Sequence, residues 1–163
     1  MIKIRPYMNE DINDILTVYR ECEDFLSLGP MSVASLKMVQ EDLLESNKTN
    51  GQYCVIISDN EIIGIVDFIR ANYMDSPQNA YISLMMISKK HRGLGIGHNV
   101  LKEIENSVLS NIQIKNIITS VQTNNESAIN FWTKNGYERI GEAELKPHTT
   151  IVYHLCKKVN STI

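Results

Sequence analysis

The sequence concentrates its glycines where they could bind a phosphate group. Three of the eight glycines, Gly93, Gly95 and Gly97, fall within five residues and directly follow Arg92. Glycine lets backbone N–H groups approach a ligand without interference from a Cβ atom, and the start of a helix adds unpaired N–H donors. The cluster therefore predicts a site for a phosphate or pyrophosphate, to which Arg92 adds a positive charge. The alternative is a tight strand-to-helix turn that binds nothing.

The spacing of this cluster excludes two common nucleotide-binding loops. A dinucleotide fingerprint needs G-x-G-x-x-G, but His98 or Val100 stands at the third glycine position. A Walker A loop needs Lys and then Ser or Thr directly after its last glycine, whereas Gly97 is followed by His98 and Asn99. We therefore expect neither a Rossmann dinucleotide site nor a nucleotide-hydrolysing loop.

Apolar periodicity predicts the strands and helices that must position the cluster. It indicates a short strand ending before Pro6 and six further strands at about residues 53–58, 62–69, 81–88, 115–121, 137–143 and 149–157. It also indicates four helices: one after an N-cap at Asn9, one from Ser32 to about residue 46, and two over about 95–110 and 123–135. Thr123 and Glu126 have the spacing of a capping box for the last helix. We expect one α+β domain over residues 1–163 with a mixed sheet.

The composition indicates which partners and which cellular compartment to expect. The 163 residues carry 16 Lys and Arg against 19 Asp and Glu, and 43% are hydrophobic, so the chain should be globular and a nucleic-acid partner is not expected. No apolar stretch reaches the roughly 18 residues of a membrane span, and the first residues lack the apolar core of a signal peptide. We expect a cytoplasmic protein with no membrane partner. Three distant cysteines, Cys22, Cys54 and Cys156, indicate a reducing compartment and no metal site.

Two motifs identify a family. Ile87-Ser-Lys-Lys-His-Arg92-Gly-Leu-Gly95-Ile-Gly97 resembles the acyl-CoA binding motif of the GCN5-related N-acetyltransferases (GNAT), and Asn125-Glu-Ser-Ala128-Ile-Asn-Phe131-Trp132-Thr-Lys134-Asn-Gly136-Tyr137 resembles the second motif of that family. The predicted order of elements also matches the family over essentially the whole chain. The resemblance implies a GNAT-like single domain of α+β class. Its central sheet would be mixed but mostly antiparallel, with about seven strands flanked by about four helices.

The resemblance also implies acetyl-CoA as cosubstrate and no metal. Main chain around Met85, Met86 and Ile87 would pair with the pantetheine arm like an added strand. Backbone N–H groups of Arg92, Gly93, Leu94, Gly95, Ile96 and Gly97 would hold the pyrophosphate, and His98 is also expected to bind the cofactor. On the other side of the cofactor the family pattern places Asn125, Ala128, Trp132 and Lys134. The alternatives are that Asn125 only caps a helix, that Ala128 and Trp132 only pack, and that Lys134 is only solvated.

The catalytic groups of the family are not all present. The aromatic residue after Phe131 is usually a tyrosine that can protonate the CoA sulfur, but here it is Trp132, whose indole N–H does not transfer its proton near neutral pH. Tyr137 and Tyr153 are possible substitutes, although a packing role is the stronger alternative for both. Some relatives use a glutamate as base at the position of Tyr81. Ser83 and Asp67 are expected to order a water there, unless Asp67 is paired structurally. The catalytic candidates are therefore Tyr81, Ser83 and Tyr137.

No motif specifies the acceptor. In this family the acceptor usually lies between the first two helices and the last hairpin, where this chain has Glu21, Glu23, Asp24, Phe25, Tyr81 and His148. We expect Asp24, Phe25, Tyr81 and His148 to contact it, and acidic residues there would favour a cationic amine. A primary amine of a small molecule is therefore the expected acceptor.

Other readings of the function remain open. A non-catalytic acyl-CoA binding or sensing module would keep the cofactor site after losing its acid, and an N-terminal or lysine acetyltransferase would act on protein amines. A homodimer is also compatible with the resemblance.

Overall fold

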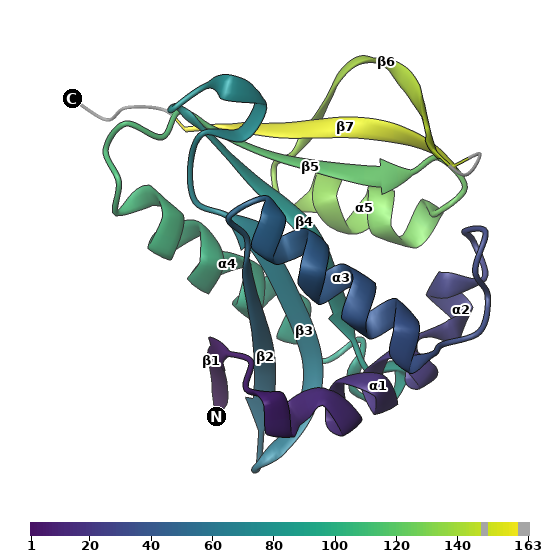
Figure 1. The fold of residues 1–163 in the computed structure, drawn as a ribbon. Helices are drawn as coiled ribbons and strands as arrows, with labels where there is room; N and C mark the ends of the chain where they lie inside the picture. The colour runs from purple at the N-terminus through teal and green to yellow at the C-terminus, as the bar shows by residue number, and fades with distance from the viewer. Residues whose placement is uncertain (148–149, 160–163) are drawn as a thin grey trace.

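Seven strands pair into one mixed sheet in the computed structural model, which describes residues 1–147 and 150–159 (Figure 1). Their order across the sheet is β1-β2-β3-β4-β5-β7-β6. The bounds are β1 Ile2–Pro6, β2 Gln52–Ser58, β3 Glu61–Ile69, β4 Asn79–Ile87, β5 Asn116–Gln122, β6 Glu138–Lys146 and β7 Thr150–Lys158. The predicted α+β fold with a mostly antiparallel sheet is therefore confirmed.

The junction of β4 and β5 is the feature of the sheet that matters for a site. Every other neighbouring pair is antiparallel, whereas β4 and β5 run parallel. Their pairing joins residues 79–82 to residues 116–119 and extends no further among the described residues. On its other side β4 stays paired with β3 as far as Ile87. The last part of β4 therefore presents an open edge toward the side of β5.

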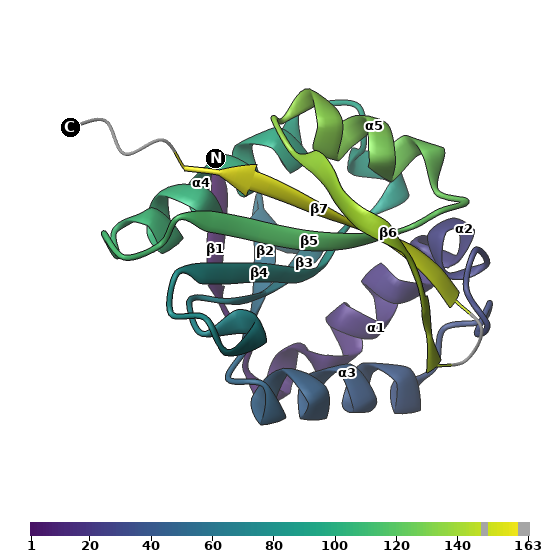
Figure 2. The same ribbon diagram turned by 90° about the horizontal axis from the view of Figure 1, so that it is seen from above.

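Helices cover both faces of the sheet (Figure 2). On one face lie α1 (Ile12–Glu21), α2 (Glu23–Leu26) and α3 (Leu36–Lys48), and on the other lie α4 (Ile96–Leu109) and α5 (Glu126–Lys134). Short 3₁₀ turns connect elements at Asn9–Asp11, Tyr73–Asp75 and Lys89–His91. Buried apolar residues form two clusters, one on each face, because successive strand residues point to opposite sides.

Four local predictions need correction. Asn9 does not cap α1; it begins a 3₁₀ turn, and the helix follows Asp11. The second long helix begins at Leu36 rather than near Ser32, because Ser35 Oγ accepts the capping hydrogen bond from Met38 N. A four-residue helix, α2, lies between these two and was not predicted.

The fourth correction concerns the start of α5. This helix is capped by Asn125, whose Oδ1 accepts from Ala128 N at 3.0 Å, and not by Thr123. The Thr123 and Glu126 pattern was thus displaced by two residues from the true cap.

The states of the three cysteines and the lengths of the helices relate to the expected compartment and to the expected absence of a membrane partner. Cys22, Cys54 and Cys156 are free thiols and are buried. Burial raises the pKa of the Cys54 thiol to about 11. None of the described helices is long and apolar enough to cross a membrane.

Candidate functional site

The glycine-rich segment forms the loop between β4 and α4. Gly93 and Gly95 both have φ of +77°, a left-handed conformation that favours glycine, and Gly95 is the N-cap of α4. No side chain caps this helix, and its first turn holds no acidic residue. Its first N–H groups and its positive dipole end therefore suit an anion.

Gly97 is constrained by a neighbour. A Cβ atom there would lie 3.3 Å from Cε2 of Phe131, so α4 and α5 approach closely at this point. The lack of a side chain at Gly97 keeps the start of α4 close to α5.

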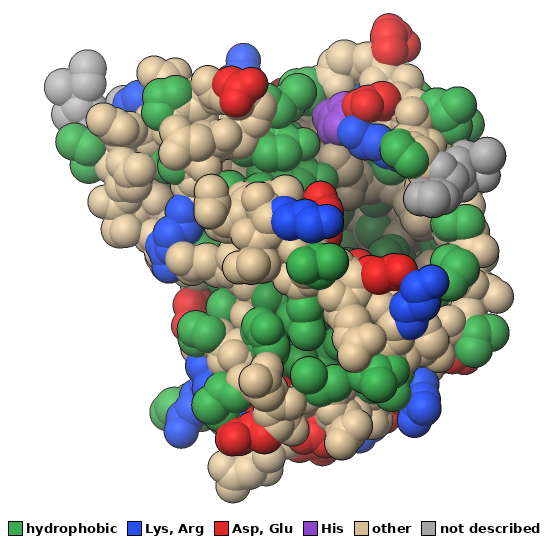
Figure 3. Space-filling view, in the orientation of Figure 1, with side chains coloured by type: hydrophobic (Ala, Val, Ile, Leu, Met, Phe, Trp, Pro, Cys, Tyr) green, Lys and Arg blue, Asp and Glu red, His purple; other side chains and the backbone are tan. Residues whose placement is uncertain are grey.

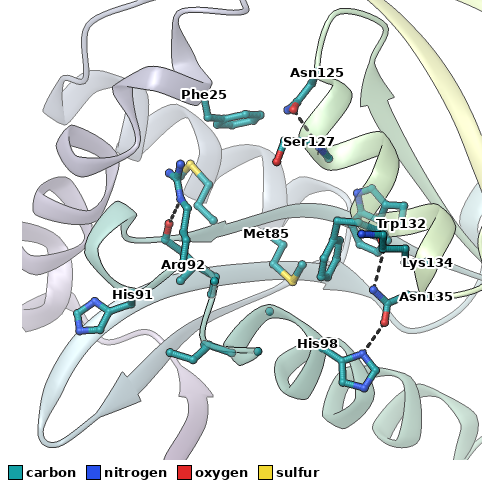
Figure 4. Close-up of a pocket in the computed structure, with 18 of the residues that line it drawn as sticks. Phe25, Met85, His91, Arg92, His98, Asn125, Ser127, Trp132, Lys134 and Asn135 are labelled. Atoms are coloured by element: carbon teal, nitrogen blue, oxygen red, sulfur yellow. Dashed lines mark hydrogen bonds between the residues drawn. The ribbon is translucent and has the colours of Figure 1, made fainter.

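A cavity of about 670 Å³ connects this loop with the open edge of β4 and with α5 (Figure 4). Of the residues expected around the cofactor it is lined by Met85, Met86, Ile87, Arg92, Gly93, Gly95, Ile96, Gly97, His98, Asn125, Ala128, Trp132 and Lys134. Leu94 is 69% exposed and does not line the cavity. Two segments about thirty residues apart in the chain are thus brought to opposite walls of one space.

The α5 wall combines a helix cap with aromatic packing. The Asn125 side chain is almost buried, and its Oδ1 caps the helix while the residue lines the cavity. Trp132 is 6% exposed and packs edge-on against Phe131 and Tyr137, with ring centroids 5.3 and 4.9 Å apart. The packing alternative for Trp132 therefore holds, and the same residue forms part of the cavity wall.

Polar side chains gather where α4 and α5 come together. His98 Nδ1 lies 2.6 Å from Asn135 Oδ1, and Asn135 Nδ2 donates to the carbonyl oxygen of Phe131 (Figure 4). Lys134 lines the cavity beside them and is exposed. A histidine and a lysine at the cavity wall, together with the helix terminus, can hold a polyanionic ligand.

Arg92 and Asp24 form an ion pair across one end of the cavity. Arg92 Nη1 and Nη2 lie 2.6 and 3.2 Å from the two carboxylate oxygens of Asp24, and Arg92 Nε donates to the Ile87 carbonyl oxygen at 2.8 Å. The hydrogen bond from Arg92 lowers the pKa of Asp24. This carboxylate is therefore engaged by the protein itself.

The other acidic residues expected near the acceptor also have internal partners. Glu21 accepts from Ser88 Oγ and lies 3.5 Å from Lys90 Nζ, while Glu23 accepts from the backbone N–H of Ala34. The expectation that free carboxylates attract a cationic amine here consequently loses its support. Phe25 lines the cavity as expected of an acceptor-side residue, and His148 lies outside the described residues.

The three catalytic candidates lie outside the cavity lining. Tyr137 is fully buried and donates to Glu105 Oε1 at 2.9 Å. Burial and the nearby Glu105 carboxylate raise the pKa of Tyr137 well above its ordinary value. This placement argues against a proton donor at Tyr137, since its hydroxyl faces the buried Glu105 rather than the cavity.

Ser83 and Asp67 form the structural pair that was the alternative at the sequence level. Ser83 Oγ donates to Asp67 Oδ2 at 2.7 Å, and Ser46 Oγ donates to Asp67 Oδ1 at 2.7 Å. Asp67 is 7% exposed and thus holds α3 against β3 and β4. Tyr81 instead stacks on Tyr73, with ring centroids 4.0 Å apart.

Sequence reasoning left several cavity residues unassigned. These are Leu28, His91, Ser127, Phe131 and Asn135. Phe131 and Asn135 stand inside the second motif, so their position was a usable signal, whereas Leu28 comes from an irregular segment that no pattern connects to the cavity. Among the described residues no group of three or more His, Cys, Asp or Glu side chains could hold a metal ion.

Similar structures share this fold. An acetyltransferase from Thermus thermophilus has a TM-score of 0.81 at 17% identity, covering 98% of this chain and 97% of that chain. An acetyltransferase from Salmonella typhimurium that modifies the N-terminal serine of ribosomal protein L7/L12 has a TM-score of 0.78 at 14% identity, covering 98% and 95%. An aminoglycoside acetyltransferase in complex with coenzyme A has a TM-score of 0.76 at 17% identity, covering 97% and 95%.

Comparison with curated protein sequences gives no significant match. A protein-family model, the Acetyltransferase (GNAT) family, matches residues 12–137, which include the glycine-rich loop, the open edge of β4 and α5. Because this match spans well over half of the chain and contains both walls of the cavity, the chain belongs to the GNAT acetyltransferase family.

Proposed function

We propose that this protein transfers the acetyl group of acetyl-CoA to a primary amine of a small molecule. The observation that carries the proposal is the cavity between the glycine-rich loop, the open edge of β4 and α5. Such a space offers N–H donors for a pyrophosphate at one end and unpaired strand edge for an amide-containing arm along its length.

Each wall has a defined part in this proposal. Backbone N–H groups of residues 92–97 hold the pyrophosphate, and main chain of residues 85–87 pairs with the pantetheine arm. His91 supports the phosphate end, because its buried Nδ1 has no partner among the described residues and the residue lines the cavity. Asn125 holds the arm from α5 with its side-chain amide group.

The chemistry then depends on positioning. The neutral amine nitrogen attacks the thioester carbonyl carbon, the C–S bond breaks, and CoA leaves as a thiolate. Trp132 supplies no proton to this sulfur, and general acid catalysis is typically worth about 10²–10⁴-fold, so the reaction proceeds without that contribution. Backbone N–H groups of β4 facing the carbonyl oxygen would stabilise the developing charge.

A small acceptor is favoured over a polypeptide by the way α2 covers the cavity. Phe25 and Leu28 line it, and Asn124 Nδ2 donates to the Leu28 carbonyl oxygen at 3.1 Å, which ties the segment after α2 to the segment before α5. This connection narrows the approach for a folded protein. The related aminoglycoside acetyltransferase acts on a small amine, while the related enzyme for the L7/L12 N-terminus acts on a protein.

A two-step experiment tests the proposal. Saturating coenzyme A at about 100 times its Kd should stabilise the protein by about 2.7 kcal/mol, which corresponds to a rise in Tm of about 5–10 °C. Release of CoA from acetyl-CoA is then measured against a panel of polyamines, aminoglycosides, amino-acid derivatives and peptides.

Each outcome selects one function. Turnover on small amines supports the proposal, and turnover on peptides alone replaces it with a protein acetyltransferase. A raised Tm without turnover on any amine identifies a non-catalytic acyl-CoA binding module. An unchanged Tm contradicts the cofactor site itself.

A further inference from the structure

Four side chains from four strands form a continuous hydrogen-bonded chain on the sheet face opposite α4 and α5. Tyr81 of β4 donates its hydroxyl proton to Ser120 Oγ of β5 at 3.1 Å. Ser120 Oγ lies 2.9 Å from Nδ1 of His154 on β7, and His154 Nε2 lies 2.5 Å from Oε2 of Glu144 on β6. These residues are far apart in the sequence, and the strand pairings bring them together.

The carboxylate of Glu144 determines which atoms donate and which accept along this hydrogen-bonded chain. A carboxylate only accepts hydrogen bonds, so His154 must donate from Nε2 to Glu144. In the neutral imidazole Nδ1 is then an acceptor, which requires Ser120 to donate to it. Every hydroxyl from Tyr81 onward therefore donates toward His154. The stacked Tyr73 is hydrogen-bonded to Tyr81, which leaves one lone pair of Tyr81 Oη to accept a proton.

The open end of the chain lies at the place where the sheet separates. Tyr81 stands in the last paired stretch of β4 and β5, and Met85, four residues further along β4, lines the cavity. Ser83, between them, is exposed, so this part of the strand is accessible from solvent. The space-filling view shows a hollow in the surface between α3 and the hairpin of β6 and β7 (Figure 3).

The side-chain oxygen of Gln122, on the same face of the sheet, lacks a hydrogen-bond partner among the described residues. Gln122 is two residues beyond Ser120 on β5, so its side chain points to the same face of the sheet. Its Oε1 is buried and has no hydrogen-bond partner among the described residues. Leaving a buried acceptor unpaired is costly, and a bound ammonium group would satisfy it.

We propose that Tyr81, Ser120, His154 and Glu144 form a proton relay that deprotonates the acceptor ammonium group before it attacks the thioester. The proposal rests on the acetyltransferase function proposed above. One N–H bond of the ammonium breaks as its proton moves to Tyr81 Oη. The Tyr81 hydroxyl proton moves to Ser120, and the Ser120 proton moves to His154 Nδ1.

The products of the relay are a neutral amine and an imidazolium beside a carboxylate, with no oxidation or reduction. The Glu144 carboxylate stabilises the imidazolium, and its half-exposed position returns the proton to solvent. The hydrogen bonds from His154 and Lys146 lower the pKa of Glu144, which keeps it ionised. In this scheme the acceptor extends from the cavity along β4 to Tyr81, which is not itself part of the cavity lining, and Ser120, His154 and Glu144 act through Tyr81.

Among the described residues, the charged and titratable groups around His154 come from β6 and from the side of β4. On β6 they are Glu144 and Lys146, whose Nζ lies 2.9 Å from Glu144 Oε1. On the side of β4 they are Tyr81 and the stacked Tyr73, whose pKa is raised first by burial and then by Tyr81. The Ser83 and Asp67 pair makes its hydrogen bonds with Ser46 instead and does not join this chain.

The test is the pH profile of kcat/KM for the amine. In the parent protein this parameter should exceed that of the relay variants most at neutral pH, where the amine is protonated and depends on the relay. His154→Asn and Ser120→Ala should lower it about 10²-fold at pH 7. The loss should shrink toward about pH 9, where solvent deprotonates the amine directly.

Glu144→Gln supplies a readout that a structural role would not produce. Loss of the carboxylate removes the group that stabilises the imidazolium formed by the relay, so kcat/KM for the amine should fall at pH 7 and recover toward about pH 9. Glu142→Gln is the matched control, because Glu142 is fully exposed on the same strand and lies 4.0 Å from Arg139 rather than near His154. Its profile should coincide with that of the parent.

NMR of the protein without substrate tests the same hydrogen-bonded chain of side chains. The ¹⁵N chemical shifts of His154 should show the tautomer protonated at Nε2, and Ser120→Ala should alter the Nδ1 shift most. The opposite tautomer, or pH profiles in His154→Asn and Ser120→Ala that match the parent, would overturn the relay while the acetyltransferase activity stands. No turnover on any amine, with coenzyme A still binding, would instead remove the proposed function and the relay with it.

Discussion

Arg92 serves the two sides of the cavity at once. Its guanidinium group holds Asp24 of α2 and the Ile87 carbonyl oxygen of β4, and the residue begins the glycine-rich loop. Cys22 also donates to the Ile87 carbonyl oxygen, so three segments converge at that single atom. The segment around α2 and the glycine-rich loop, on two sides of the cavity, are therefore connected by an ion pair.

We expect Asp24→Asn to act on the cofactor rather than on the amine. An exposed ion pair is typically worth about 0.2–1 kcal/mol, so losing the group that holds Arg92 should raise KM for acetyl-CoA about two- to five-fold. KM for the amine should stay within about two-fold of the parent. Glu41→Gln, which breaks an exposed ion pair with Lys37 on α3, is the control and should change neither parameter. A raised KM for the amine alone would restore Asp24 as an acceptor ligand.

Gly97 tests the anion site at the start of α4. Gly97→Asp adds a carboxylate where the pyrophosphate should bind, and like charges there should abolish the Tm increase with coenzyme A. Gly97→Asn adds nearly the same volume without the charge, so it should retain part of that increase. Both variants must shift the ring of Phe131 by a few tenths of an ångström, and their unliganded Tm values should therefore be similar. Equal coenzyme A affinity in the Asp variant and the parent would contradict the site.

At the scale of elements, a single residue at the start of α5 contributes both to the helix and to the cavity wall. Asn125 Oδ1 caps the helix, and Asn125 also lines the cavity. The start of this nine-residue helix and part of the cavity wall are consequently formed by the same residue.

Two substitutions at Asn125 separate these tasks. Asn125→Ala should lower the free energy of unfolding by about 1 kcal/mol and weaken acetyl-CoA binding, because both the cap and the amide group are lost. Asn125→Asp keeps an oxygen that can cap the helix, so the free energy of unfolding should return toward that of the parent. The affinity for the cofactor should stay low, because the amide group is still lost. Urea unfolding and isothermal titration with coenzyme A measure the two effects. Thr123→Ala is the control, since Thr123 does not cap α5. Full affinity for coenzyme A in Asn125→Asp would show that Asn125 acts only as a helix cap.

At the scale of the whole molecule, a carboxylate joins the first strand to the first helix. Asp11 is 4% exposed, lies 2.6 and 2.8 Å from Arg5 Nη1 and Nη2, and accepts from Met8 N at 2.7 Å. The hydrogen bond from Arg5 is the main cause that lowers the pKa of Asp11. The edge strand β1 is thereby attached to the helix that covers β3 and β4.

The stability of the fold should depend on pH through this group. A lowered folded-state pKa means that the unfolded chain binds the proton more tightly, so the stabilisation is present above the ordinary Asp pKa of about 3.9 and is lost as pH falls through the folded-state pKa. Asp11→Asn should cost about 1–2 kcal/mol at pH 7, since Arg5 is partly exposed, and progressively less as pH falls through the folded-state pKa. Urea unfolding at pH 7 and at acidic pH measures the difference. The exposed Asp14→Asn is the control, and a cost for Asp11→Asn that is equal at both pH values would contradict the ion pair.

Local patterns in the chain determined much of the fold and most of the cavity lining. Strand and helix periodicity placed all seven strands and four of the five described helices within a few residues, because burial of one face imposes a period of two or 3.6 on the sequence itself. The glycine-rich loop and the second motif predicted most of the cavity lining for a similar reason, since each is a short continuous segment that carries its own backbone geometry. The helix α2 was missed because four residues are too few to show a period.

The remaining contacts were decided by tertiary structure. Asp24 and Arg92 are 68 residues apart, and Tyr81, Ser120 and His154 follow one another at intervals of 39 and 34 residues. Such partners are chosen by strand order and register, and a shift of one residue in any of these pairings would turn the side chains to the other face of the sheet. The sequence by itself therefore determined the glycine-rich loop and the helix start where we propose that a pyrophosphate binds. Only the packed sheet decided which acids are already paired and which hydroxyls reach a histidine.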